Sequence, residues 1–119
     1  MSGLDRQIEG YETVKVWLNG LREQSGVDPA NDPSRLKLLE EFCRFVDLNP
    51  DEVLKACLLE KPGRDTKISI KGRRLMAEKI ADFQAAAEGL SARERAGRGN
   101  TVRSFLIHNG ILLQSGTQV

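Results

Sequence analysis

The sequence has few of the side chains that carry most enzyme chemistry. It contains one tyrosine, Tyr11, one histidine, His108, and two cysteines, Cys43 and Cys57. Two thiols and one imidazole do not make a zinc site, and both cysteines stand in apolar helical patterns, which favours buried thiols over a disulfide. Tyr11 lies on an apolar stripe, which favours a core position over a nucleophile. Because phosphate loops, serine elbows and metal-ligand spacings are also missing, we expect no catalytic residue, metal or cofactor, and no enzyme activity of the chain by itself.

Long apolar runs are absent as well. The longest are far short of the roughly 20 residues that a membrane-spanning helix needs, and the N-terminus lacks a basic region followed by an apolar one. A chain of 119 residues, 39% hydrophobic and 29% charged, has the size and composition of one soluble globular domain. We therefore expect a single cytoplasmic domain with no membrane partner.

The net charge of +1 hides an uneven distribution of charge. Residues 1–60 hold 7 basic and 12 acidic side chains, a net charge of −5, whereas residues 61–119 hold 11 basic and 5 acidic ones, a net charge of +6. A basic half is typical of chains that bind a polyanion, although charges also serve only to solvate a helical surface. The charge pattern leaves both interpretations open.

Apolar residues recur at three- and four-residue steps along the chain, which is the period of amphipathic helices. Helix starts are indicated by Asp32-Pro33, Asn49-Pro50 and the capping box Ser91…Glu94, and helix ends by Lys61-Pro62-Gly63 and Asn109-Gly110. No alternation typical of strands is present. The sequence therefore predicts an all-α, compact bundle of four to five helices in one domain, residues 1–113, followed by a frayed tail or the start of a linker over 114–119. The predicted helices span residues 6–23, 33–47, 50–59, 65–89 and 92–108.

The fourth predicted helix carries a basic stripe. From Lys61 to Lys79 the chain has seven basic and two acidic residues. At 100° per residue, Lys67, Lys71 and Arg74 fall within about 60° of one another and opposite the apolar side. Such a stripe suits a row of phosphates, and it is also what a solvated helix face looks like. The residues that this helix is expected to bury are Ile68, Leu75, Met76, Ile80, Phe83 and Ala87.

The last predicted helix combines arginines with short polar side chains. Arg93, Arg95 and Arg98 crowd its first half, where the unpaired amides of a helix N-terminus also favour phosphate. Because the last two arginines point toward the apolar side, a common DNA surface would lie across the N-terminal end of the helix. The short polar groups expected on the outward face, within reach of base edges or phosphates, are Asn100, Thr101 and Ser104.

Two glycines lie in the interior of the same helix. Gly97 and Gly99 each cost about 1 kcal/mol of helix stability relative to alanine. That cost indicates close approach of another backbone, which is either a neighbouring helix or DNA.

Several motifs occur together along the chain: Phe42-Cys43-Arg44-Phe45, Asn49-Pro50-Asp51-Glu52, Phe83…Leu90-Ser91, and Val102-Arg103-Ser104-Phe105 followed by Asn109-Gly110-Ile111. In combination, over residues 8–112, they resemble the N-terminal core-binding domain of tyrosine recombinases, the phage-integrase family. The resemblance implies a SAM-like bundle of four to five helices that clamps a recombination site on double-stranded DNA. It also implies a C-terminal domain carrying the catalytic Arg, His and Tyr, and assembly of several copies on DNA.

By position, the resemblance places the segments matching 34–47 and 92–108 on the DNA. The sequence departs from the family pattern at two places. Asp32-Pro33-Ser34-Arg35 stands where the family often has Thr and Tyr, and Arg95 stands near a position where a Thr is common. Arg103 matches an arginine of the family that serves either DNA or structure, for instance by pairing with an acid on a neighbouring helix. The DNA contacts that the resemblance implies are Arg35, Lys37, Arg93, Arg95 and Arg98.

Two other functions remain open from the sequence. One is a helical protein–protein adaptor whose basic half docks an acidic partner. The other is an excision or regulatory factor that binds DNA without a catalytic partner. The salt dependence of duplex binding separates the adaptor from the DNA-binding functions, because phosphate contacts release counterions.

Overall fold

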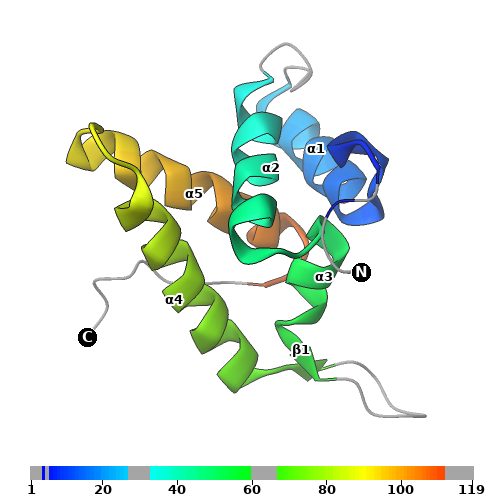
Figure 1. The fold of residues 1–119 in the computed structure, drawn as a ribbon. Coiled ribbons are helices and arrows are strands. Elements are labelled where there is room, and N and C mark those ends of the chain that lie inside the picture. Colours follow the sequence, from blue (N-terminus) through cyan, green and yellow to red (C-terminus); the bar gives the residue numbers. More distant parts are fainter. Residues whose placement is uncertain (1–3, 5, 27–32, 60–66, 112–119) are drawn as a thin grey trace.

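Five α-helices account for most of the chain that the structure, a computed structural model, describes: residues 4, 6–26, 33–59 and 67–111 (Figure 1). The predicted all-α class is therefore confirmed. The predicted Asp32 cap, the break at Lys61-Pro62-Gly63 and the 114–119 tail lie outside the described residues. The elements in chain order are a 3₁₀ turn η1 (Ile8–Gly10), α1 (Glu12–Ser25), α2 (Ser34–Val46), α3 (Pro50–Lys55), β1 (Leu58–Leu59), β2 (Lys67–Ile68), α4 (Ile70–Ala86) and α5 (Ala92–His108).

The predicted helix ends that rest on local capping are confirmed. Asn49 and Glu52 form a capping box at the start of α3, and Ser91 and Glu94 form another at the start of α5. Hydrogen bonds with the backbone and the side chain of Ser91 lower the pKa of Glu94. After α5, Gly110 adopts a φ of 90°, and the Ile111 amide then bonds to the Leu106 carbonyl at 2.8 Å. Each of these signals acts within a few residues, which is why the sequence displays them.

The predicted bounds of two helices in the middle of the chain are wrong. The helix predicted over 50–59 ends at Lys55, and the helix predicted over 65–89 begins only at Ile70. Between them β1 and β2 pair antiparallel, with Leu58 opposite Ile68, so the prediction of no strand is also wrong. Ser69 then starts α4, since its hydroxyl accepts from the Gly72 amide at 2.9 Å.

The helix predicted over 6–23 is also divided. Tyr11, between η1 and α1, has extended backbone angles, φ −84° and ψ 139°, and its side chain is buried. The Arg6 guanidinium covers the ring at 4.8 Å from its centroid. In place of one continuous helix, the chain therefore forms η1, an extended residue at Tyr11 whose ring is buried, and α1.

Helix α5 lies at the centre of the core and packs against α1, α2 and α4. Trp17 of α1 meets Phe105 edge-on at 5.7 Å between ring centroids, and Phe42 of α2 meets Phe83 of α4 at 5.3 Å. α4 and α5 join at the 87–91 turn and diverge from it (Figure 1). Among the described residues, no helix is both long and apolar enough to cross a membrane.

The buried stripe predicted for the fourth helix is only partly right. Met76, Ile80 and Phe83 are buried, whereas Leu75 and Ile68 are 48% and 42% exposed. Ile68 lies in β2 rather than on the helix, so its side chain follows the pleat of the hairpin. Leu75 lies on the outward side of α4, close to the basic residues.

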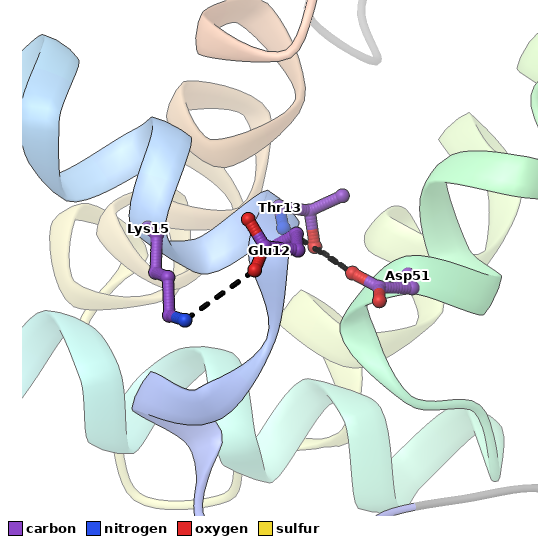
Figure 2. Close-up of polar contacts among 4 residues, drawn as sticks. All are labelled: Glu12, Thr13, Lys15 and Asp51. Carbon is purple, nitrogen blue, oxygen red and sulfur yellow. Dashed lines mark hydrogen bonds and ion pairs between the residues drawn. The ribbon is translucent and has the colours of Figure 1, made fainter.

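The start of α1 is capped from another helix. Tyr11 offers no side-chain cap, but Asp51 of α3 accepts from both the Thr13 hydroxyl, at 2.6 Å, and the Thr13 amide, at 3.2 Å. Figure 2 shows this contact beside the pair of Lys15 with Glu12, which lies within α1. The carboxylate thus satisfies an amide that no local side chain reaches, and it ties α1 to α3.

Candidate nucleic-acid interface

The arginines of α5 divide into two sets, as their positions on the helix predict. Arg95 is half-buried, and its Nε donates to the Ala87 carbonyl at 3.1 Å, across the turn that joins α4 to α5. Arg98 lies over the Phe83 ring, with its Cζ 4.0 Å from the centroid, and its Nη1 donates to Glu41 at 3.3 Å. Both guanidinium groups therefore hold the fold together, whatever else they contact. Arg93, by contrast, is exposed and has no hydrogen-bond or ion-pair partner among the described residues.

The outward face of α5 follows Arg93 along the helix. Gly97 is exposed, and a Cβ built on it would meet no atom within 4 Å. Asn100 is exposed, and its Oδ1 accepts from Arg103 at 3.0 Å. The Thr101 hydroxyl donates to the Gly97 carbonyl at 3.0 Å. Arg93, Gly97, Asn100 and Thr101 thus form one ridge, which we call the α5 ridge.

Ser104 was expected on the same outward face, and that expectation is wrong. Its hydroxyl accepts from Nε1 of the buried Trp17 at 3.0 Å. An indole N–H in an apolar core requires an acceptor, and α1 covers this part of α5 to provide the contact. Ser104 is therefore a structural residue.

The two glycines of α5 have different surroundings. Gly99 is buried, and a Cβ there would overlap the side chain of Gln84 on α4, lying 2.5 Å from its Cδ. Gln84 in turn accepts from Arg103 Nη2 at 2.9 Å. Helix packing therefore explains Gly99, and the partner of Arg103 on the neighbouring helix is an amide rather than an acid. Burial lowers the pKa of Arg103. No packing in the described part of the chain explains Gly97.

Helix α2, which packs against α5, carries two further basic residues. Arg35 and Lys37 are exposed on its first turn, and neither side chain has a hydrogen-bond or ion-pair partner in the described structure. The ion pair of Arg98 with Glu41 joins α2 to α5 one helical turn beyond Lys37. The basic residues of α2 and α5 that the resemblance implies are thus brought to neighbouring helices.

The basic residues of the α4 region lie elsewhere. Lys67 is in β2, outside α4, so the predicted helical stripe from Lys67 to Arg74 is wrong. Lys71 and Arg74 are exposed in the first turns of α4, and about 18 Å of helix separates Arg74 from the α5 end of α4. Ile70 and Leu75, 68% and 48% exposed, lie next to them. The candidate residues thus form two groups, at opposite ends of α4.

The side chains with most chemical reactivity lie inside the fold. Cys43 and Cys57 are free and buried, as expected. Burial, with a smaller contribution from Glu40 and Glu52, raises the pKa of Cys43 to about 12, and burial raises that of Cys57 to about 11. Tyr11 is in the core, as expected, and the Nδ1 of His108 lies 2.9 Å from the Ser104 carbonyl oxygen.

One residue of this region has no counterpart in the sequence interpretation. Glu41 was not among the residues that the sequence singled out, yet it is the acid that meets Arg98. The only available signal was its position four residues after Lys37, which places both on one side of α2. The described residues contain no group of three metal-binding side chains.

Comparisons of the chain with protein-family models, with curated proteins and with solved structures give no match. The geometry of the described residues therefore carries the functional conclusion.

Proposed function

We propose that this chain is a double-stranded DNA-binding module, in the manner of a SAM-like core-binding domain of a tyrosine recombinase, whose catalytic residues would lie in a separate C-terminal domain. One observation carries the proposal. The side chains of Arg35, Lys37 and Arg93 are exposed and unpaired within the described chain, and the ion pair of Arg98 with Glu41 joins the two helices that bear them.

The proposed binding is driven mainly by phosphates. Arg35, Lys37 and Arg93 are point contacts to the backbone. Asn100 and Thr101, further along the α5 ridge, are the groups proposed to reach base edges. Gly97, between Arg93 and Asn100, leaves the helix surface bare, which suits close approach of a nucleic-acid backbone.

The test is fluorescence anisotropy on a generic duplex across a salt series. Each phosphate contact adds about 0.9 to the slope of log affinity against log salt. We expect Arg35→Ala/Lys37→Ala to lower that slope by about 1.8, and Arg93→Ala by about 0.9. Arg95 and Arg98 are unsuitable for this test because their removal also disturbs the fold.

Lys71→Ala/Arg74→Ala provides the matched variant, since it removes the same charge as the α2 double variant from the far end of α4. A loss of slope in the α2 double variant alone would limit the DNA surface to α2 and α5. An equal loss in both would extend it to the basic residues of α4. An unchanged slope in the α2 double variant and in Arg93→Ala would refute the proposed surface.

A protein–protein adaptor is the second candidate, and one observation favours it. Ile68, Ile70 and Leu75 are exposed around Lys71 and Arg74, which gives an apolar surface with basic residues beside it. Such a surface suits an acidic amphipathic partner better than a phosphate backbone. Absence of duplex binding at low salt would favour this function.

A further inference from the structure

The contact of Arg98 with Glu41 places a negative charge one helical turn from Lys37, a residue of the proposed DNA surface. The Arg98 side chain is 19% exposed and the Glu41 side chain 46% exposed, so the pair lies at the edge of the core and within reach of solvent. Arg98 Nε is buried and has no hydrogen-bond partner among the described residues. One face of the guanidinium lies on the Phe83 ring, and only Nη1 meets the carboxylate. The arginine thus retains donors that this single contact does not use.

The positions on α2 place this pair beside Lys37. Lys37 precedes Glu41 by four residues on α2, and Arg98 meets Glu41 from α5. Residues so spaced are neighbours on a helix surface. A phosphate bound between α2 and α5 would therefore approach Glu41 as well as the basic side chains, and the carboxylate would repel it.

Stability alone does not account for an acid at this position. The Phe83 ring covers one face of the Arg98 guanidinium, and α4 packs against α5, so Arg98 is held in place without Glu41. An ion pair whose acid is half exposed adds little to the stability of a folded protein. A phosphate that approaches Arg98 competes with Glu41 for a guanidinium that is already oriented and partly desolvated.

We propose that Glu41 limits the affinity for DNA by occupying Arg98, and that a backbone phosphate must displace it to gain this arginine. This inference rests on the proposed function. Without the charge of Glu41, the Phe83 ring would still hold the Arg98 guanidinium in place. Glu41 is thus an affinity-limiting residue of the same surface.

The experiment compares Glu41→Gln with Glu12→Gln by anisotropy on the same duplex and salt series. The control removes the same charge and also breaks an ion pair, that of Glu12 with Lys15 on α1, away from the contact of Arg98 with Glu41. One additional phosphate contact steepens the slope by about 0.9, which corresponds to about five- to tenfold tighter binding at 0.1 M salt. We expect that gain for Glu41→Gln and less than a twofold change for Glu12→Gln.

A second pair of variants ties the gain to Arg98. Arg98→Met keeps an unbranched side chain on the Phe83 ring without the charge, and a circular dichroism melt checks that this variant folds. Adding Glu41→Gln to Arg98→Met should give no more than the Glu12→Gln change. Equal gains for Glu41→Gln and Glu12→Gln, or a full gain in the Arg98→Met background, would overturn the inference alone. Absence of DNA binding by the wild type and by Glu41→Gln would overturn both the inference and the proposed function.

Discussion

Replacing Gly97 by alanine separates the stability of α5 from its proposed role in binding DNA. Gly97 lies in the interior of a 17-residue helix, and a Cβ there would meet no atom within 4 Å. The substitution therefore gives the usual gain of a helical Gly→Ala change, about 0.5–1 kcal/mol, with no steric penalty inside the fold. An unfolding entropy of about 2.1 cal/mol/K per residue, applied to 119 residues, converts this gain into a rise in Tm of about 2–4 °C.

The proposed function predicts the opposite effect on binding. A methyl group on the bare surface between Arg93 and Asn100 would hold the DNA backbone away from the α5 ridge, so Gly97→Ala should raise Tm and weaken duplex binding together. The assays are thermal unfolding by circular dichroism and anisotropy on the same duplex. Tighter or unchanged DNA binding in the stabilised variant would refute the role of Gly97 in close approach.

Gly99→Ala is the matched control, two residues further along the same helix. Its methyl group would displace the Gln84 side chain and break the hydrogen bond from Arg103, which contributes about 1.5–3 kcal/mol when the donor is charged. That loss exceeds the gain in helix propensity, so we expect a net destabilisation of about 1 kcal/mol. A rise in Tm for Gly99→Ala would contradict the helix contact described here.

Three further predictions concern stability. Asp51→Ala should destabilise the fold by about 1–2 kcal/mol in urea unfolding, because it removes the cap of α1, whereas Asp51→Asn, which keeps an acceptor oxygen, should lose less. Ser104→Ala should cost about 1–3 kcal/mol by the same assay, since it leaves the Trp17 N–H without its acceptor. Cys43 and Cys57 ionise at about 12 and 11 in the folded chain, against an ordinary pKa of 9.0. Below pH 9 both thiols are protonated in the folded and in the unfolded chain. Above pH 9 the thiols of the unfolded chain ionise first, so the free energy of unfolding should fall between pH 9 and 11, by up to about 1.4 kcal/mol per pH unit for each thiol. A slope as steep in Cys43→Ala/Cys57→Ala would contradict the last prediction.

The sequence was sufficient where structure is decided within one helical turn. The capping boxes at Asn49 and Ser91 and the stop at Gly110 use side chains and backbone groups only a few residues apart. The hairpin between α3 and α4 was missed because its two strands are only two residues long, which is too short for alternation to appear. Once that pairing was missed, the start of α4 at Ser69 could not be found either.

The candidate site was predictable only in part. Exposed, unpaired basic residues such as Arg35 and Arg93 follow from periodicity and charge. The structural roles of Arg98 and Ser104 do not, because their partners lie 57 and 87 residues away in the sequence, at Glu41 and Trp17. Long-range contacts of this kind are set by how helices pack, and a single sequence carries no direct signal for them.

The cap that Asp51 provides for α1 has a consequence for the order in which the chain folds. α3 and α5 carry their own capping boxes, so their first turns are stabilised as soon as the local chain becomes helical. The first turn of α1 must await an acceptor 38 residues away, and its formation requires closure of that loop. The Thr13 amide is therefore a reporter of docking between α1 and α3. Its hydrogen-exchange protection should appear only when the two helices meet, later than that of Glu94 at the start of α5.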